Sequence, residues 1–364
     1  MSAEQVEVLV PIPIPEKFSY LLPNKIKDTP PRPGARVVVP FGNRNLVGVV
    51  WDVKKNINTN SYKPPHFPFE NPPFRLSMGL LKVSKQEWFE IFDVKERAKH
   101  FAEKRKLLAD YHQDVFMADA LALEASIEVF NMMVQHLPSV RPDLYSRSDN
   151  SIKLEPHSGY EGEEWSTDLK TNDIHPLDLA ARLVQEDLVI MLPPDKKQSA
   201  WWLGGGSVAF PSRWNLKEKL GQTMDVIHAP VPFYKKQLQT PTNKFFDQMP
   251  YDEIFSRRNW SIHDDPSLRQ DGTNQGEKRE DITPNNAGEK LWLRVERQTL
   301  RKLKKTGAIL FTIRIHLRKL KHIVTFEGIA DQLSKAFSSL PPEMHTYKKT
   351  HTFADSVQAY LNQF

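Results

Sequence analysis

The sequence predicts an α+β fold in which helices surround an antiparallel sheet, preceded by a small β module. Residues 289–317 show two alternating strand patterns on either side of Lys-Lys-Thr-Gly, which is typical of an antiparallel hairpin. Residues 94–136 contain neither Pro nor Gly and are rich in strong helix formers. The first 56 residues consist of short strand patterns separated by turn residues, which indicates a separate small sheet.

Four short strands are expected in this N-terminal module. Val6–Val10 and Phe18–Leu22 are extended segments separated by a Pro-Ile-Pro-Ile-Pro break. Arg36–Pro40 and Val47–Val53 predict a hairpin joined by Phe-Gly-Asn-Arg-Asn. Residues 57–73 are rich in Pro and Asn and form the predicted linker, which leaves residues 74–364 as the main domain.

The helical pattern at residues 94–136 is long for a globular protein. We therefore expect a break near Tyr111–Met117, and Pro138 is expected to end the pattern. The predicted apolar stripe consists of Leu107, Tyr111, Val115, Ala118 and Ala122.

Short elements follow in quick succession. His175–Arg182 predicts a helix, and Asp187–Leu192 predicts a strand. Trp201–Leu203 and Ser207–Phe210 predict two more strands, joined by a tight turn at Gly204–Gly206.

Polar stretches predict the remaining connections. Residues 146–174 and 264–289 are expected to be loops, and a polar helix is expected at the C-terminus. Between the loops, Asn215 is the expected N-cap of a short helical turn at Leu216–Leu220, which Gly221 ends.

The composition excludes several kinds of site. The 364 residues include no cysteine, so disulfides, thiolate nucleophiles, cysteine zinc sites and iron–sulfur ligation are excluded. The chain also lacks a Walker loop, a His-Glu-x-x-His motif and a Gly-x-Ser-x-Gly elbow. A redox metal would therefore need His, Tyr, Met or carboxylate ligands, and electrons from an iron–sulfur centre would need another chain.

Charge and hydropathy indicate a cytoplasmic protein. No run of 18 apolar residues occurs, and the N-terminus, Met-Ser-Ala-Glu-Gln-Val-Glu, is acidic where a signal peptide is basic and then apolar. The formal net charge is +5. Part of the excess falls at one turn, where a solvated rim or a docking surface for nucleic acid or an acidic electron-transfer partner is expected. The turn residues are Arg301, Lys302, Lys304 and Lys305.

The 289–317 hairpin also carries an unusual polar pattern. In its first arm Leu291, Leu293 and Val295 share one face. The other face carries Trp292, Arg294, Glu296 and Gln298. Such a face suits a pocket for a charged or redox-active ligand, and it equally suits a solvated sheet face with cross-strand ion pairs.

His228 is notable for its position. It follows a short helical pattern and precedes Ala-Pro-Val-Pro, whose prolines keep the backbone extended. A rigidly held imidazole suits an axial metal ligand, and a structural His bonded to the backbone is the alternative. His175, His263 and His316 are the next candidates for a ligand.

Arginine side chains supply the candidates for anion binding. A guanidinium group pairs with a carboxylate in bidentate fashion, so Arg213, Arg258 or Arg294 could hold the carboxylates of a cofactor or polar substrate. The same groups could instead form structural ion pairs with Glu186, Asp187 or Glu296.

Six ordered stretches of the main domain resemble the haem-dependent oxidative N-demethylase family. They are Pro-Phe-Arg-Leu-Ser-Met-Gly-Leu (73–80), Arg-Leu-Val-Gln-Glu-Asp-Leu (182–188), Phe-Pro-Ser-Arg-Trp-Asn-Leu-Lys-Glu-Lys-Leu-Gly (210–221), Ile-His-Ala-Pro-Val-Pro (227–232), Arg-Asn-Trp-Ser-Ile (258–262) and Leu-Arg-Val-Glu-Arg-Gln-Thr-Leu (293–300). The resemblance implies a haem-binding PAS-like fold and NADPH-driven, O2-dependent removal of a methyl group from a secondary amine such as dimethylamine. It also implies separate flavin/iron–sulfur reductase and folate-binding subunits, in agreement with the absence of cysteine.

The resemblance also implies roles for particular residues. His228 is the expected proximal ligand of the haem iron, and Arg294, Glu296 and Arg297 are expected in a polarised distal pocket or at the propionates. A regular strand points Arg297 away from the other two, so at most two of the three are expected to reach one pocket. The expected cofactor contacts are Arg213, Arg258 and Trp260.

The N-terminal module resembles something else, the 3′-DNA-end-binding domain of the bacterial primosomal replication-restart helicase. The matching stretches are Val-Pro-Ile-Pro-Ile-Pro-Glu-Lys-Phe-Ser-Tyr-Leu-Leu-Pro (10–23) and Pro-Gly-Ala-Arg-Val-Val-Val-Pro-Phe-Gly-Asn-Arg-Asn-Leu-Val-Gly-Val-Val (33–50). Ser19 stands where that family usually has an Asp that contacts the terminal nucleotide.

Three functions follow as hypotheses. The first is the haem subunit of an oxidative N-demethylase. The second is a haem-binding PAS-like sensor or interaction protein without turnover. The third is a nucleic-acid-binding protein that acts through residues 1–56.

Overall fold

The computed structural model describes residues 3–9, 18–21, 31–41, 44–55, 67–69, 74–91, 94–156, 159–196, 198–271 and 279–364. Contacts divide the chain into two units, Met1–Pro65 and His66–Phe364. The predicted break at residues 11–15 and most of the predicted linker at 57–73 lie outside the described residues.

The first unit contains an antiparallel sheet, as predicted. Its described strands are β1 (Ala3–Leu9), β2 (Phe18–Leu21), β3 (Arg36–Phe41) and β4 (Arg44–Lys55), in the order β2-β1-β4-β3. Val6, Val8, Val39 and Val50 are buried together and form its core. The predicted hairpin is confirmed, and its pairing continues to Phe41 opposite Arg44, which makes the connection shorter than expected.

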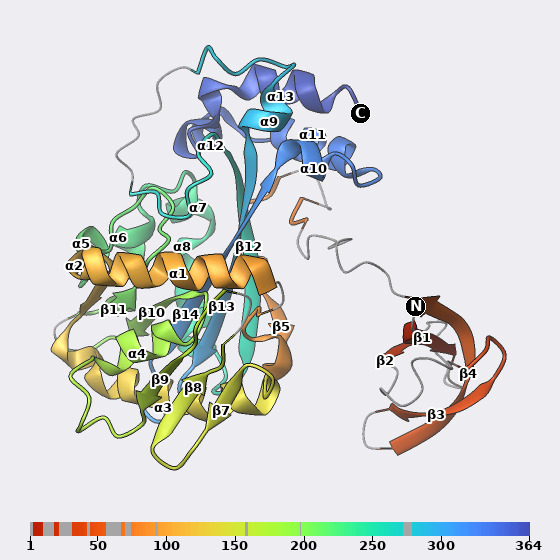
Figure 1. The fold of residues 1–364 in the computed structure, drawn as a ribbon. Coiled ribbons are helices and arrows are strands. Elements are labelled where there is room, and N and C mark those ends of the chain that lie inside the picture. Colours follow the sequence, from red (N-terminus) through yellow and green to blue (C-terminus); the bar gives the residue numbers. More distant parts are fainter. Residues whose placement is uncertain are drawn as a thin grey trace. The chain divides into compact units, whose positions relative to one another are not determined.

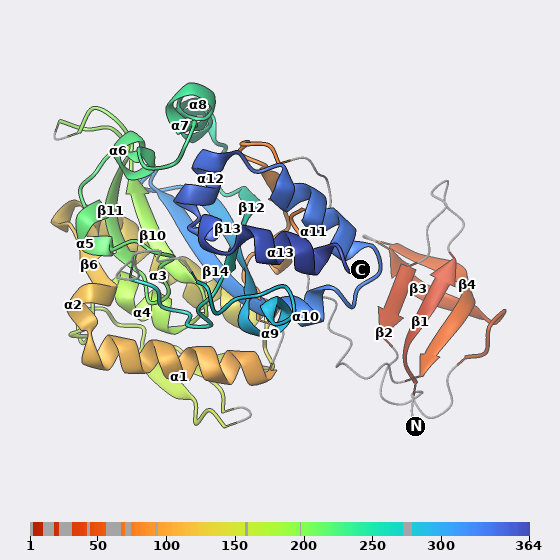
Figure 2. The ribbon, with the colours of Figure 1, turned by 90° about the horizontal axis from the view of Figure 1, so that it is seen from above.

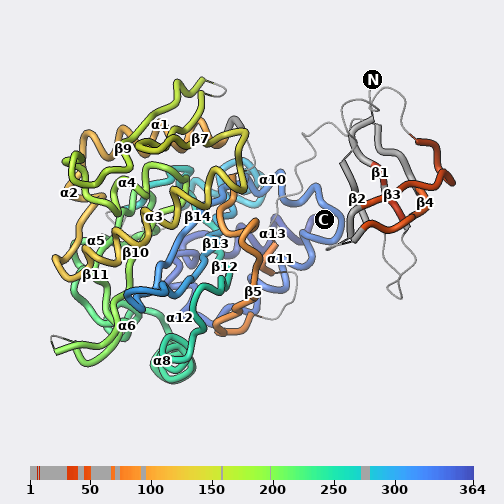
Figure 3. The backbone as a smooth tube through the Cα atoms, turned by 90° about the horizontal axis from the view of Figure 1, so that it is seen from below, coloured from red at the N-terminus to blue at the C-terminus, as the bar shows by residue number. Residues whose placement is uncertain are grey.

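A larger antiparallel sheet organises the second unit, which confirms the α+β prediction. Where the structure describes this unit, the strand order is β5-β12-β13-β14-β10-β11-β6, with β5 at one edge beside β12 (Figure 3). Its strands are β5 (Leu81–Val83), β6 (Phe116–Ala118), β10 (Asp187–Leu192), β11 (Trp202–Ser207), β12 (Ile254–His263), β13 (Trp292–Lys302) and β14 (Ile309–Lys319). The predicted hairpin is β13–β14, and its register continues without a shift from Trp292–Lys319 to Lys302–Ile309.

Strand alternation defines two faces of this sheet. The first face carries Leu293, Val295 and Arg297, and the second face carries Arg294 and Glu296. At the two ends of the first face, buried residues of α3 and α4, and of α11 and α13, pack against the strands. Residues of α5, α6 and α8 pack against the second face.

The helices of the second unit lie at both ends and on both sides of this sheet. The C-terminal helices gather at one end of the long strands, and α3 lies near the other end (Figure 1). Seen from above, α1 and the segment α6–α8 lie on opposite sides of the sheet (Figure 2). The helices up to α8 are α1 (Val94–Asp110), α2 (His112–Val115), α3 (Leu123–Val140), α4 (Pro176–Arg182), α5 (Leu216–Lys219), α6 (Met224–His228), α7 (Tyr234–Gln237) and α8 (Gln239–Gln248). The later ones are α9 (Ala287–Lys290), α10 (Leu320–Ile323), α11 (Ile329–Ser338), α12 (Pro342–Tyr347) and α13 (Ala354–Leu361).

The predicted turn at Gly204–Gly206 is wrong, because one strand, β11, runs through the three glycines. A Cβ on Gly204 would lie 2.5 Å from Cδ1 of Leu192, and a Cβ on Gly205 would lie 3.1 Å from Cβ of Ala118. The glycines therefore serve close approach of neighbouring strands, which local sequence does not reveal.

The long helical pattern breaks where predicted but ends later than expected. It divides into α1, α2 and α3, with the short strand β6 between α2 and α3. Pro138 lies inside α3, which continues to Val140. A proline this close to the C-terminus of a helix removes one hydrogen bond of the last turns, and the helix tolerates the loss. Tyr111, predicted to be apolar core, is exposed because the chain turns there between α1 and α2.

Two other predictions are wrong. Residues 146–174 contain a small antiparallel sheet of β7 (Tyr145–Arg147), β8 (Ser151–Leu154) and β9 (Glu163–Ser166). The C-terminal region forms α10 to α13 where one polar helix was expected, and these helices bury Leu333, Phe337 and Val357. The helices at His175–Arg182 and Leu216–Leu220 are confirmed, with His175 and Asn215 as N-caps.

Candidate functional site

The centre of the second face carries a carboxylate between two amides. The β12–β13 pairing sets Asn259 opposite Glu296 and Arg257 opposite Gln298. Oε2 of Glu296 accepts hydrogen bonds from Nδ2 of Asn259 at 3.5 Å and from Nε2 of Gln298 at 3.1 Å. Nη1 of Arg257 donates to Oε1 of Gln298 at 3.1 Å. The register of two strands therefore builds this cluster directly.

A second cation reaches the same cluster from the C-terminal region. Lys348 follows α12, and its Nζ donates to Oδ1 of Asn259 at 3.3 Å and to the carbonyl oxygen of Trp260. Burial lowers the pKa of Lys348 to about 8, although the charge of Glu296 favours the protonated form. Burial also lowers the pKa of Arg257. Buried Lys348 and half-buried Arg257 thus lie close to one carboxylate, which leaves an excess of positive charge.

The centre of the second face keeps limited contact with solvent, and the side chain of Glu296 is 13 % exposed. Arg257, Asn259 and Glu296 are half-buried. Leu300 and Ile315, which lie on the same face to either side, are buried. Solvent access at the middle of a face that is otherwise covered is what a small ligand needs.

Arg294 lies on the Glu296 face but is engaged with the backbone. Its side chain is 1 % exposed, and its two Nη atoms donate to the carbonyl oxygens of Leu268 and Phe210 at 3.0 and 2.9 Å. Its Nε lies 3.8 Å from Oε1 of Glu296. Arg294 therefore contributes charge beside Glu296 and holds two loops in place.

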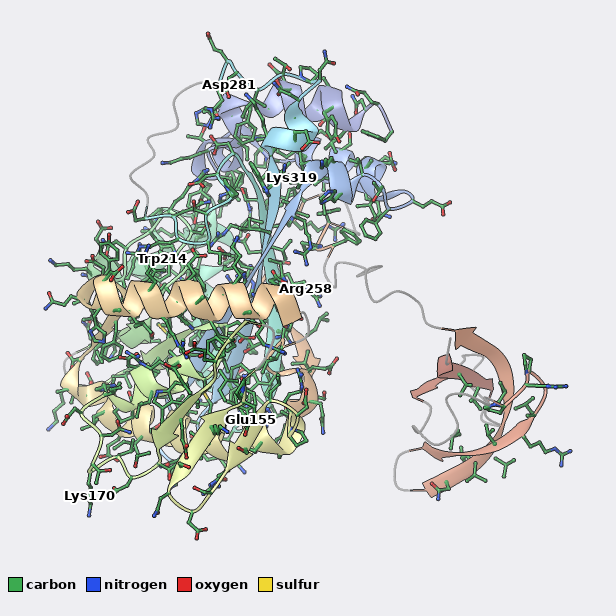
Figure 4. The ribbon with its side chains drawn as sticks, in the orientation of Figure 1. Glu155, Lys170, Trp214, Arg258, Asp281 and Lys319 are labelled. Carbon is green, nitrogen blue, oxygen red and sulfur yellow. The ribbon has the colours of Figure 1, made fainter. Side chains whose placement is uncertain are left out.

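The structure does not bring Arg297, Arg258 and Trp260 to Glu296, because all three lie on the first face. Arg297 forms an ion pair with Glu90 at 3.2 Å and donates to the carbonyl oxygen of Trp88 at 2.9 Å. Arg258 is exposed and lies well apart from Trp214 in Figure 4. Trp260 is buried in the core formed with the C-terminal helices.

Arg213 donates a hydrogen bond to the backbone of Lys348. Its backbone has a φ of 61°, and its Nη1 donates to the carbonyl oxygen of Lys348 at 2.7 Å. Its Nη2 lies 3.7 Å from Oδ1 of Asp264. A left-handed conformation at a residue other than glycine is strained, and such strain is concentrated at functional sites. Arg213 thus joins the 210–215 segment to the C-terminal region beside the cluster.

His228 is the last residue of α6, which covers the second face. Its Nδ1 bonds to the carbonyl oxygen of Met224 at 2.9 Å, and its ring stacks on that of Tyr234 with centroids 4.9 Å apart. Burial lowers the pKa of His228, and the charge of Arg257 lowers it further. The ring is therefore neutral at pH 7, and its Nε2 has no hydrogen-bond partner among the described residues.

The other histidine candidates are engaged elsewhere. His175 accepts a hydrogen bond from the backbone of Leu177 as the N-cap of α4. Nδ1 of His263 bonds to Gln270 at 2.7 Å, and Nε2 of His316 bonds to Glu90 at 2.7 Å. His228 is the best placed of the four for a ligand on the second face.

The hairpin face predicted from the sequence includes Gln298 beside Glu296, but Arg257, Asn259 and Lys348 were not predicted as members of the cluster. The alternation in residues 257–262, combined with the hairpin face, could have identified Arg257 and Asn259. No local signal identifies Lys348. The basic turn was only partly exposed as expected, because Arg301 and Lys302 are buried.

Two searches bear on metals and membranes. Within the described ranges, no group of three or more His, Cys, Asp and Glu side chains could hold a metal ion. Among the helices that the structure describes, none is long and apolar enough to cross a membrane.

Comparison with protein families gives two matches. The model described as haem-dependent oxidative N-demethylase, alpha subunit-like, matches residues 79–358. The model of a 3′ DNA-binding domain matches residues 7–74. Both resemblances expected from the sequence are confirmed, and the second match extends further along the chain than the motifs that indicated it.

Proposed function

We propose, on the premise that this chain belongs to the haem-dependent oxidative N-demethylase, alpha subunit-like, family, that its second unit is the haem subunit of an amine demethylase. The reaction proposed is O2- and NADPH-dependent removal of a methyl group from a secondary amine such as dimethylamine, within a PAS-like fold. The observation that carries the proposal is Glu296, which accepts hydrogen bonds from Asn259 and Gln298 on the face that α6 covers. Arg257 and Lys348 contact these two amides in turn.

The chemistry of the residues present supports haem binding. His228 offers a neutral imidazole whose Nδ1 is fixed by a backbone carbonyl, which leaves Nε2 for the iron. Bound haem supplies one-electron and O2 chemistry that no side chain of this chain provides.

The protein groups bind and orient the amine. Oε1 of Glu296 accepts no hydrogen bond from a described residue, so it can accept the N–H of the amine and take up its proton. Arg257 and Lys348 supply fixed positive charge that stabilises negative charge as it develops during the reaction. Arg294 keeps Glu296 between the loops that it ties together.

Electrons and folate chemistry require partners in this proposal. Because the chain has no cysteine, a separate flavin/iron–sulfur reductase delivers electrons from NADPH. A folate-binding subunit accepts the one-carbon product. The family name, which describes an alpha subunit, supports an assembly of this kind.

The test is absorption spectroscopy followed by turnover. The purified chain, supplied with haem, is expected to show a Soret band, and addition of dimethylamine, NADPH and a suitable reductase is expected to release formaldehyde. Absence of a Soret band contradicts haem binding. A Soret band without formaldehyde release supports the sensor hypothesis instead.

We also propose that the first unit binds 3′-ended single-stranded DNA, because residues 7–74 match the 3′ DNA-binding domain model. Ser19 replaces the usual Asp, so weaker selection of the terminal nucleotide is expected. Gel shifts with oligonucleotides that end in a 3′-hydroxyl or a 3′-phosphate test this. No shift at low salt contradicts it, because phosphate contacts dominate at low ionic strength.

A further inference from the structure

The two oxygens of Glu296 have different surroundings. Oε2 accepts from the amides of Asn259 and Gln298. Among the residues that the structure describes, the cation nearest to Oε1 is Arg294, whose Nε lies 3.8 Å away, beyond hydrogen-bond distance. Oε2 is thus occupied by protein donors, and Oε1 is available to a donor of the ligand.

The orientation of both amides is set by the cations behind them. A side-chain amide offers an acceptor at one end and donors at the other. Nη1 of Arg257 occupies the oxygen of Gln298, and Nζ of Lys348 occupies the oxygen of Asn259. Each amide must therefore present its NH2 group to Glu296. The path from Arg257 through Gln298 to Glu296 consists of two hydrogen bonds of 3.1 Å. The path from Lys348 through Asn259 to Glu296 consists of hydrogen bonds of 3.3 and 3.5 Å, so the Arg257 path is the stronger.

We propose that Arg257 and Lys348 are positioning residues that act through Gln298 and Asn259 to saturate Oε2 of Glu296, which leaves Oε1 as the single acceptor for an N–H of the substrate. This inference rests on the proposed function and adds a rule for the substrate. A ligand needs an N–H as well as positive charge. Dialkylammonium ions satisfy the rule, and quaternary ammonium ions do not.

The rule separates a hydrogen-bonded site from a purely electrostatic one. If Glu296 attracted any cation by charge alone, removal of the nearby charge of Lys348 would strengthen cation binding. If Lys348 positions Glu296 through Asn259, the same removal frees the amide to turn and weakens binding of an N–H donor. The two explanations predict changes of opposite sign.

The experiment uses the full chain loaded with haem and two probes, dimethylammonium and tetramethylammonium. Binding is measured by the change in the Soret band and by calorimetry. The wild type is expected to bind dimethylammonium at least about tenfold more tightly, because one hydrogen bond to a charged group has that effect. Gln298→Leu is expected to lose about tenfold in dimethylammonium affinity, and tetramethylammonium binding is expected to be unchanged.

Three variants complete the set. Asn259→Leu is expected to show a smaller loss, because its bond to Glu296 is longer. Lys348→Met is expected to weaken dimethylammonium binding, and Lys348→Arg is expected to restore most of it. Gln358→Leu is the matched control, because it removes a part-buried amide that bonds to Ser334 and Asn362 between α11 and α13. Haem content reports folding for each variant.

The outcomes separate the two proposals. A wild type that takes up no haem contradicts the proposed function. A haem-loaded wild type that binds both probes equally, or that does not bind dimethylammonium, overturns the positioning role alone. Tighter dimethylammonium binding in Lys348→Met, or an unchanged probe ratio in Gln298→Leu, overturns it as well.

Discussion

Burial of Lys348 lowers the stability of the folded chain, because its charged ammonium group leaves water for the cluster. The ordinary pKa of 10.5 falls to about 8 in the folded chain because burial disfavours the charged form. The unfolded chain therefore binds more protons between these two pH values, and the free energy of unfolding rises with pH across that window. Below pH 8 the full cost applies, roughly 3 kcal/mol from the shift in pKa.

Lys348→Met is therefore expected to raise the free energy of unfolding at pH 7. The gain is smaller than the full cost, about 1 kcal/mol, because the carbonyl of Trp260 loses its donor. Urea unfolding at pH 7 and at pH 10.5 measures it, and the gain should be lost at the higher pH. Lys335→Met, at an exposed lysine that pairs with Asp331, is the control and should change little. Destabilisation of Lys348→Met at pH 7 would contradict this expectation.

His228→Ala is expected to lose haem or to alter the ferric spectrum strongly, because no described residue bonds to Nε2 of His228, which leaves that nitrogen for the iron. The absorption spectrum after haem reconstitution measures this, and added imidazole should restore part of the Soret band. His322→Ala, at an exposed histidine, is the control. An unaltered spectrum in His228→Ala would place the ligand elsewhere.

Only those site residues that belong to a local sequence pattern could be predicted. Glu296 was singled out because a strand face with Trp, Arg, Glu and Gln is unusual, and it lies at the centre of the cluster. Arg258 and Trp260, the predicted cofactor contacts, lie on the first face, whereas Arg257 and Asn259 of the same strand lie on the face of Glu296. Only the pairing register decides between these alternatives.

At the scale of elements, hydrophobic alternation predicted the β13–β14 hairpin well. A short apolar run predicted β10, which is buried along its whole length. The prediction of a turn at Gly204–Gly206 was wrong, because these glycines allow the close approach of neighbouring strands. The three strands between residues 145 and 166 were not predicted, because polar residues dominate them. Tertiary contacts outweigh local propensity in both places.

The packing of β11 against β10 supplies a test at this scale. Gly204→Ala is expected to destabilise the protein by about 1–3 kcal/mol, because the new Cβ meets Cγ and Cδ1 of Leu192 at 2.6 and 2.5 Å. Chemical unfolding measures the loss. Leu192→Ala removes the clash, so the double variant should be more stable than the sum of the two single changes predicts. Simple additivity would show that the two residues do not compete for the same space.

At the scale of the whole molecule, each unit has its own core. The described hydrophobic clusters of the second unit contain residues of that unit alone, beginning with Phe67 and Phe69. Val6, Val8, Val39 and Val50 form the core of the first unit. The two family matches also concentrate on different units. Separate cores and separate matches indicate two domains joined in one chain.

A chain that begins at His66 should therefore fold and keep the haem chemistry. The cluster around Glu296, the His228 site and the sheet that carries them all lie after this residue. We expect the shortened chain to show the same Soret band and the same dimethylammonium affinity as the full chain, and to lose binding of 3′-ended DNA. Absorption spectra, calorimetry and gel shifts on the two chains measure this. Loss of haem on removal of residues 1–65 would show that the first unit contributes to the haem site, and the two functions would then have to be regarded as one.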